Sequence, residues 1–472
     1  MVLKGARGTG GSENVLKKIY YSGGRFSKPG YEKKGKNRIK GLSLILILLF
    51  IVFIIAYGVY KLFLIPAPLI EGAEAFKLLP LDKTVVLKGK NLKSIEIFIN
   101  QGGKRVELLK DLPETIDKTF TLQVKPKELE LADGSATVII KVRSGILRDI
   151  KYEINATVDT VPPNIEVLKA SYIIQQGSGG FALLRARDAD SVFIKLKEHT
   201  FRAYKTTSET DLEPSLNLKS TAARYYVFFP APFDIKDDVV FYAVATDAAG
   251  NQNVKALPTR FKTKKFRTSS INISDSFINT VIFSLLNITD TSDPAGAFKK
   301  VNEEWRESNL KKLAEVSLET APEILWKDRF LQLKNSEVTA IYGDRRTYLY
   351  KGKITSKSSH LGYDLASVKN SKVIAANSGL VRFAEDLGIY GKTVIIDHGL
   401  GLMSLYGHLS NIMVEKGQSV EKGEVIARTG STGLAGGDHL HFGILIHGYE
   451  VSPLHWWDPH WVKVNVTDLL EQ

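Results

Sequence analysis

The chain contains no cysteine, and only 3 of its 472 residues are methionine. A disulfide framework is therefore excluded, and any metal site must be built from histidine and carboxylate ligands without thiolates. A protein without cysteine also needs no oxidant in order to fold outside the cytoplasm. Its stability must come from packed cores, for which 44% hydrophobic residues is an ordinary supply.

Excess positive charge is scarce beyond the N-terminal segment. The net charge is +13, and residues 1–40 hold 11 Lys and Arg against 2 Glu, so 13 − 9 leaves only +4 for all the others. A basic cluster confined to one end, directly before an apolar run, is typical of a membrane-topology signal. We therefore expect no nucleic-acid partner.

One long apolar run is present, LSLILILLFIVFIIAYGVY at 42–60. As a helix rising about 1.5 Å per residue, it is long enough for the roughly 30 Å core of a bilayer. A cleavable signal peptide has a shorter apolar core, so although Ala73-Glu74-Ala75 imitates a cleavage site, we expect a retained transmembrane helix over 41–65. The positive-inside rule places the basic segment 1–40 in the cytoplasm and the chain after about Pro66 outside.

The next two segments have strand character. Alternating apolar residues at 94–99 and 136–142 predict a β module over 66–158. A second β module over 159–265 resembles bacterial immunoglobulin-like modules, because it begins with an Asp-x-x-Pro-Pro linker and closes with Ala-x-Asp-x-x-Gly-Asn. We interpret both modules as a stalk, and the alternative that they bind a partner stays open.

Residues 266–335 change in character. Apolar residues at helical spacing over 297–318 and 321–333 predict two helices, and hence a helical connector. No sustained heptad repeat is present, which argues against a long coiled coil.

Histidine is concentrated in the last predicted domain, 336–472. Eight of the nine histidines lie between His360 and the C-terminus. Neutral imidazole is both a zinc ligand and a proton carrier near neutral pH, so this crowding is what a metal-dependent hydrolase needs. Asp364 follows His360 in a His-x-x-x-Asp pattern, and His439 and His441 form a His-x-His pair.

In a strand, alternate side chains share a face, so His439 and His441 would point into one cleft with Leu440 in the core behind them. His360, Asp364 and His441 offer three ligands, which leaves a fourth tetrahedral position for water. That is the pattern of a catalytic rather than a structural zinc site.

Several separated motifs of this domain occur in a specific order: IYGDRR at 341–346, HLGYDLA at 360–366, VIAANSG at 373–379, TVIIDHG at 393–399, SLYGHLS at 404–410, GSTG at 430–433 and HLHF at 439–442. Over roughly 336–465 this series resembles the lysostaphin-like M23 family of zinc metallopeptidases, also called LytM-type. The resemblance implies an antiparallel-β peptidase domain, and hence a mainly β multidomain chain.

The resemblance also implies the roles of five residues. The zinc ligands would be His360, Asp364 and His441. His408 and His439 would be catalytic residues that lie beside the metal without ligating it, and that orient and deprotonate water or stabilise the tetrahedral intermediate.

Other positions carry weaker expectations. Many family members have Glu after His-Leu-His-Phe, where this chain has Gly443, so the surroundings of the ligands are expected to differ. We expect Tyr363 and Tyr406 to line the cleft, His398 to occupy a hairpin turn and His199 to lie at the surface.

The leading functional hypothesis is a membrane-anchored zinc metalloendopeptidase that hydrolyses peptide cross-links of bacterial peptidoglycan. It would be a single-pass protein of the bacterial inner membrane, with its catalytic domain in the periplasm or otherwise outside the cytoplasm. One alternative is a non-catalytic LytM-type regulator of other wall hydrolases, which loss of metal ligands would mark. Another is a structural stalk or adhesin. The cross-link cleaved, and any regulatory partner, stay open.

Overall fold

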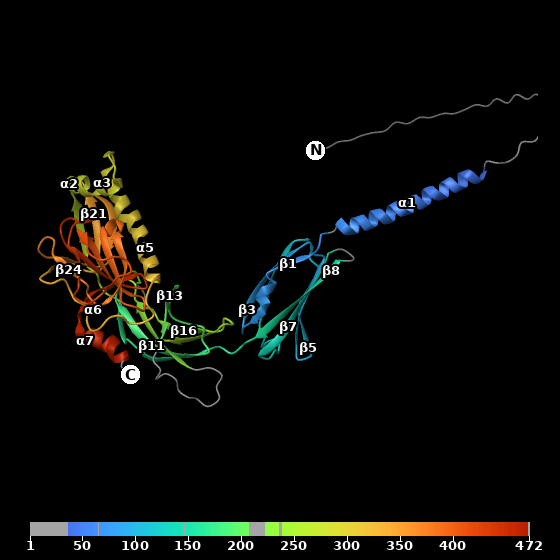
Figure 1. Ribbon diagram of the computed structural model, residues 1–472, viewed down its shortest axis with the longest axis horizontal. Helices are drawn as coiled ribbons and strands as arrows, with labels where there is room; N and C mark the ends of the chain where they lie inside the picture. The colour runs from blue at the N-terminus through green and yellow to red at the C-terminus, as the bar shows by residue number, and fades with distance from the viewer. Residues whose placement is uncertain (1–35, 65, 145–147, 207–221, 236–237, 471–472) are drawn as a thin grey trace, which may run out of the picture.

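The computed structural model describes residues 36–470, except 65, 145–147, 207–221 and 236–237 (Figure 1). The predicted basic segment therefore lies almost entirely outside the described residues. Strands dominate the described part, which bears out the expected mainly β multidomain fold with one apolar N-terminal helix.

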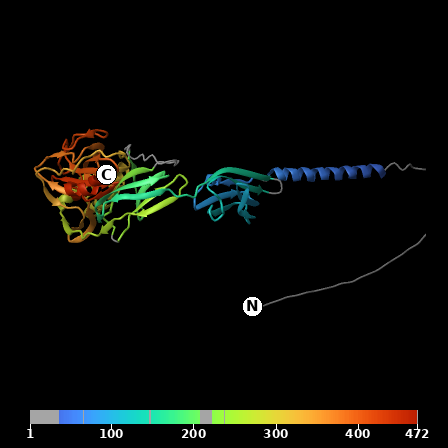
Figure 2. The same ribbon diagram turned by 90° about the horizontal axis from the view of Figure 1, so that it is seen from below.

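That helix, α1 (Lys36–Leu64), contains an uncharged 18-residue window, Ser43–Tyr60, with a mean hydropathy of 2.8. None of the window is buried by the rest of the protein, and Figures 1 and 2 show α1 extending away from the β modules. A helix of this length and composition is suited to span a bilayer or to serve as a signal sequence.

The first β module consists of two facing sheets, with strand orders β1-β3-β6 and β2-β8-β7-β4-β5. Alternation along its strands sends Val85 and Leu87 of β3 and Ile95 and Ile97 of β4 into one core. Its elements are β1 (Leu69–Glu71), η1 (Ala73–Lys77), β2 (Leu78–Leu79), β3 (Lys83–Lys90), β4 (Ser94–Gln101), β5 (Lys104–Asp111), β6 (Lys118–Val124), β7 (Gly134–Ser144) and β8 (Arg148–Val158).

The second β module is also built from facing sheets, ordered β14-β15-β11-β9 and β13-β12-β16-β17, with β10 paired to β18. Its elements are β9 (Asn164–Ala170), β10 (Ile173–Gln175), β11 (Gly179–Arg187), β12 (Ser191–Leu196), β13 (His199–Arg202), β14 (Tyr204–Lys205), β15 (Ala223–Pro230), β16 (Tyr242–Thr246), β17 (Gln252–Ala256) and β18 (Arg260–Lys262).

The Asp-x-x-Gly-Asn stretch that closes this module has a structural explanation. The Oδ1 atom of Asp247 accepts hydrogen bonds from the backbone N–H groups of Gly250 and Asn251, both at 2.8 Å. The Asn251 side chain donates to the Asp159 carbonyl at 2.8 Å and accepts from the Leu81 N–H at 2.7 Å. The turn therefore ties the end of the second module to the linker and to the first module.

The C-terminal domain is organised around one large sheet, ordered β20-β23-β31-β27-β26-β25-β29, with β32 paired to β31. Its elements are β20 (Glu337–Ala340), β21 (Asp344–Tyr350), β22 (Lys353–His360), β23 (Tyr363–Ala366), β24 (Lys372–Ile374), β25 (Gly379–Asp386), η5 (Gly388–Tyr390), β26 (Lys392–Asp397), β27 (Leu402–Leu409), β28 (Asn411–Ile412), β29 (Ser419–Val420), β30 (Val425–Arg428), β31 (Leu440–Ile446), β32 (Tyr449–Val451), α6 (Leu454–Trp457), α7 (Pro459–Val462), η6 (Lys463–Thr467) and α8 (Asp468–Leu470).

The segment between the second module and this sheet is only partly helical. It begins with a strand that pairs in parallel with β21, and helices then pack on the face of the large sheet that carries Leu405 and Leu445. Its elements are β19 (Thr268–Ile273), α2 (Asp275–Phe277), η3 (Ile278–Ile282), α3 (Phe283–Leu286), α4 (Pro294–Lys300), η4 (Val301–Trp305) and α5 (Arg306–Leu318).

The prediction of a helix over 321–333 is wrong. Its backbone N–H groups bond to the C-terminal domain instead of to their own segment, as Leu325 does to His398 and Leu331 to Ala376. The apolar side chains of Trp326 and Phe330 are buried in the core of that domain. The segment is therefore an extended strap, and its apolar spacing reflects the surface that it covers.

The second module shares a core with the C-terminal domain, against which it lies in Figures 1 and 2. The ring of Phe228 in β15 packs 5.8 Å from Trp456 and 6.4 Å from Trp326, measured between ring centroids. The Ile446 side chain also packs directly on the backbone of the second module, since a Cβ atom on Gly179 would lie 2.3 Å from its Cδ1 atom. His199, which we expected at the surface, is half-buried, and its ring bonds to the Tyr449 hydroxyl across this contact at 2.7 Å.

We expect Phe228→Ala to destabilise the C-terminal domain as well as the module that carries it. Truncating a fully buried Phe costs about 3–5 kcal/mol. All five tryptophans lie at or beyond Trp305, so their fluorescence reports on the part of the chain after the two modules. In Phe228→Ala, the denaturant concentration at the midpoint of unfolding, followed by this fluorescence, should fall. The control Tyr172→Ala, at a side chain that is 66% exposed, should leave the midpoint unchanged. An unchanged midpoint for Phe228→Ala would show that the module is an independent spacer.

Candidate metal centre and active site

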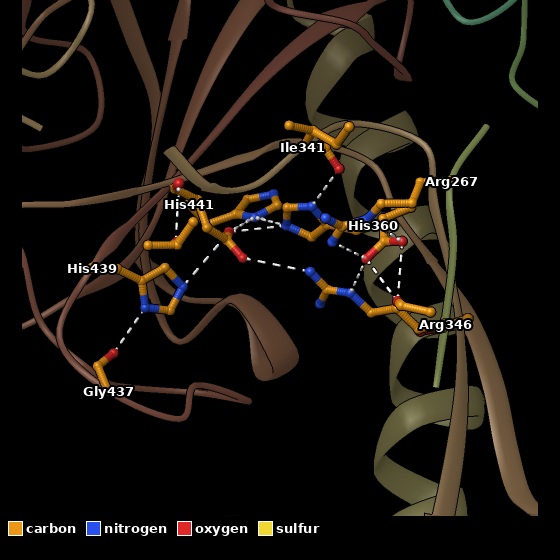
Figure 3. Close-up of polar contacts among 12 residues, drawn as sticks. Arg267, Ile341, Arg346, His360, Gly437, His439 and His441 are labelled. Carbon is orange, nitrogen blue, oxygen red and sulfur yellow. Dashed lines mark hydrogen bonds and ion pairs between the residues drawn. The ribbon is translucent and has the colours of Figure 1, made fainter. Parts of the chain in front are cut away.

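Strand register brings the three predicted metal ligands together. β23 pairs with β31 so that Asp364 lies opposite His441, and His360 ends β22, the strand before β23. One donor atom from each of the three side chains lies within 4.8 Å of the others. Figure 3 shows the rings of His360 and His441 close together in this cluster.

The donor atoms are arranged as a cation site requires. Asp364 Oδ1 lies 2.9 Å from His360 Nε2 and 3.0 Å from His441 Nδ1, and the two ring nitrogens are 3.1 Å apart. His360 donates from Nδ1 to the Ile341 carbonyl at 3.0 Å, which leaves a lone pair on Nε2. At such distances a carboxylate oxygen and imidazole nitrogens are held together by a shared proton or by a cation, and all three are donor types that bind zinc. The residues therefore fit a metal ion.

Two neighbours shape the ligand set. Gly362 lies between two of the ligands in sequence, and a Cβ atom there would be 2.5 Å from both Cε1 and Nε2 of His441, so a side chain would displace that ring. The guanidinium of Arg346 lies 3.7 Å from Asp364 Oδ2 and bonds to Asp344 at 3.3 Å. It holds the outer oxygen of Asp364, so that Oδ1 faces the two histidines.

His408 and His439 lie beside this cluster in the same cavity, with ring centroids 4.8 Å apart. Each pairs its Nδ1 atom with a backbone carbonyl at 2.8 Å, His408 with Thr432 and His439 with Gly437. Each therefore keeps Nε2 for other partners. His408 adopts a left-handed backbone conformation, φ 60°, which is uncommon for a residue with a side chain and occurs most often where function fixes it.

The two non-ligand histidines differ in proton affinity. Burial, aided by the neighbouring histidines, lowers the pKa of His408 to about 3, so its ring is neutral at pH 7. Burial also opposes protonation of His439, but the hydrogen bond and charge of Asp364 outweigh it and raise the pKa of His439. The pair thus contains one ring kept neutral and one that carries a proton more readily.

A cavity of about 410 Å³ opens over these five residues. Its walls include Arg346 and Tyr390 from the C-terminal domain, and Phe277 and Arg306 from the preceding helical segment. Sequence reasoning identified none of these four. Arg346 lies within the quoted IYGDRR motif, but the others come from segments with no recognisable motif.

The prediction that Tyr363 and Tyr406 line the cleft is wrong. Each is the neighbour of a residue on the cleft face of a strand, so its own side chain points to the opposite face. The Tyr406 hydroxyl accepts a hydrogen bond from the Ala376 N–H in the core, and Tyr363 packs on Trp457. Tyr390, from η5, stands over His441 at 5.4 Å between ring centroids.

A buried carboxylate lies near the position where the family's usual glutamate is missing. Gly443 and Leu445 share the face of β31 that carries His441, and Glu450 of β32 pairs with Leu445. Tyr390 donates its hydroxyl to Glu450 at 2.7 Å. Glu450 therefore holds the ring that packs on a predicted metal ligand, and no motif in the sequence indicates this role.

Two of the other C-terminal histidines, His398 and His447, form hydrogen bonds that stabilise the fold away from the cluster. His398 lies in the turn between β26 and β27, and its ring nitrogens are 2.7 Å from the Ser378 carbonyl and the Ser404 hydroxyl. His447 bonds to the Phe228 carbonyl of the second module at 3.0 Å.

We expect the chain to bind one Zn²⁺ ion at this cluster. Asp364→Ala should weaken that binding by more than about 100-fold, since even loss of a partner outside the ligand set costs about 10–100-fold. Competition with a chromophoric chelator measures the affinity, and Glu385→Ala, at an exposed carboxylate of β25, is the matched control. Equal affinities for the two variants would exclude the cluster as the site.

We expect Glu450→Gln to change how stability depends on pH. Burial raises the pKa of Glu450 from 4.5 to about 7, so the folded chain holds this proton more tightly than the unfolded chain. The contribution of protonated Glu450 to the free energy of unfolding is fully present below about pH 4.5. It is lost as pH rises through 7, a loss of about 3 kcal/mol. Glutamine keeps the bond from Tyr390 without titrating. The free energy of unfolding, measured at pH 5 and pH 8, should therefore rise for the variant relative to the wild type at the higher pH. An equal difference between the two proteins at both pH values would contradict this.

Comparison with known proteins identifies the family that the C-terminal domain matches. The model of peptidase family M23 matches residues 358–453. Peptidoglycan DD-endopeptidase ShyA of Vibrio cholerae is 36% identical over 95 residues, which are 20% of this chain and 22% of that protein. Murein hydrolase activator EnvC of Escherichia coli is 37% identical over 95 residues, which are 20% of this chain and 23% of that protein.

The matched stretch spans about a quarter of the length of these curated relatives. Among solved structures, the catalytic domain of the antimicrobial peptidase lysostaphin from Staphylococcus simulans is 27% identical, with a TM-score of 0.22, and the match covers 26% of this chain and 92% of that one. The motifs, the histidine and aspartate cluster and the family match all concern the same residues. The C-terminal part of this chain is a peptidase family M23 domain.

Proposed function

We propose that this protein is a membrane-anchored zinc metalloendopeptidase that hydrolyses peptide cross-links of bacterial peptidoglycan. The observation that carries the proposal is the convergence of His360, Asp364 and His441 with two non-ligand histidines in one cavity. Relatives that match this domain bear the names of a peptidoglycan endopeptidase and of a murein hydrolase activator.

Zinc, when bound, supplies a Lewis acid that makes water nucleophilic near neutral pH. His408 is kept neutral by burial and fixed by Thr432, so its Nε2 atom is suited to accept a hydrogen bond from the attacking water. His439 lies at the edge of the ligand cluster, with its Nε2 atom 3.6 Å from Asp364 Oδ1, so it is placed to hold a proton beside the carbonyl oxygen or the leaving amine.

The apolar helix supports an anchored location. Under the proposal, α1 spans the cytoplasmic membrane once with the N-terminus in the cytoplasm, and both β modules and the peptidase domain lie outside. The first module then separates the catalytic body from the membrane. No nucleic-acid partner is proposed.

A regulator that activates other wall hydrolases is the second candidate, because a relative of this domain is named as an activator. Both candidates predict binding to the cell wall, but only the first predicts new peptide termini. The complete ligand set favours the enzyme, since a regulator has no need of a metal site with water access.

We expect the detergent-solubilised, zinc-loaded chain to release fragments from purified peptidoglycan that mass spectrometry identifies by new peptide termini. Chelation and His408→Ala should each reduce the release by at least about 100-fold, within the usual contribution of acid–base catalysis. His460→Ala, at an exposed residue of α7, is the matched control and should retain activity. Intact peptidoglycan in the presence of bound zinc would shift the assignment to the regulator.

A further inference from the structure

The cavity over the metal cluster carries an excess of positive charge. Its charged lining residues are Asp364 and two arginines, Arg306 and Arg346, and a bound divalent cation would add to the positive side. Arg346 is already occupied, since it contacts both Asp344 and Asp364. Arg306 differs, because no carboxylate oxygen of the described residues forms an ion pair with it within 4.0 Å.

Arg306 is also held in a fixed orientation. Its Nε atom donates to the Asn302 carbonyl at 3.2 Å, and its Nη2 atom donates to the Asn302 side chain at 3.0 Å. Asn302 is itself only 1% exposed and donates to the Ser356 hydroxyl at 2.8 Å. Both groups that accept from Arg306 are neutral, and its Nη1 donors are not used in these bonds. Its charge acts on the buried Glu450, whose pKa it helps to lower against the effect of burial, but no ion pair joins the two residues. A half-buried, oriented guanidinium beside a cavity is suited to bind a carboxylate.

We propose that Arg306 binds a free carboxylate of the peptide substrate. The favoured substrate is then a cross-link in which the residue that supplies the scissile amine also bears a free carboxylate, as a diamino dicarboxylic acid does, and not a bridge of glycines. Apolar lining residues such as Ile271, Phe277 and Leu434 suit the aliphatic part of such a residue. The inference rests on the proposed function and makes Arg306 a residue that determines specificity.

Two synthetic cross-linked peptides test the inference, identical except that the diamino residue has either a free carboxylate or its amide. We expect the zinc-loaded full chain to cleave the free acid with a kcat/KM about 10–100-fold above that for the amide, the range for one charged contact of roughly 1.4–2.7 kcal/mol. Arg306→Gln should bring this ratio close to one, and Arg306→Lys should retain part of it. Lys312→Gln removes a charge from an exposed position of the same helix and should leave the ratio as in the wild type.

Equal cleavage of both peptides by the wild type would overturn the inference. So would Arg306→Gln lowering both rates by the same factor, which would mark a purely structural role through Asn302. Cleavage of neither peptide would instead contradict the proposed function. In that event calorimetric binding of the two peptides decides the inference alone: a preference for the free acid that Arg306→Gln abolishes supports it, and equal or absent binding overturns it.

Discussion

The pairing of β23 with β31 is the constraint on which the site depends. It sets Asp364 opposite His441, and the short turn before β23 leaves His360 within 2.9 Å of the same carboxylate oxygen. A slip of β23 by one residue would send Asp364 to the opposite face of the sheet, into the apolar core and away from His441. Burial of Leu440 and Phe442 on that face fixes the register, so the packing of the core also determines the geometry of the metal ligands.

The folded unit that carries the histidine cluster extends well beyond the M23 domain. The second β module contributes Phe181 and Phe228 to the core of the peptidase sheet, and the segment before that sheet contributes a strand, packed helices and one wall of the cavity. The strap at 321–333 covers the other side of the same core. The first β module has its own core, so it alone among the modules has the character of a spacer.

Motifs made the ligand cluster predictable, because residues within one strand or turn have fixed relative directions. The same periodicity should have placed Tyr363 and Tyr406 on the far face, as neighbours of cleft-facing residues. Tyr390, Glu450 and Arg306 were beyond prediction, since only tertiary packing brings their separate elements together. The prediction of a helix over 321–333 failed because the apolar residues of this extended strap are spaced by the surface that they cover, and that spacing happens to match a helical one.

X-ray absorption spectroscopy of the zinc-loaded chain is the sharpest test of the metal cluster, because it reports the ligands of the metal without any assumption about substrate. We expect four-coordinate zinc with two imidazole nitrogens at about 2.0–2.1 Å, one carboxylate oxygen and one further oxygen from solvent. Loss of that spectrum in Asp364→Ala would tie it to the cluster. Zinc without two imidazole ligands, or with a ligand set that Asp364→Ala leaves unchanged, would contradict the account.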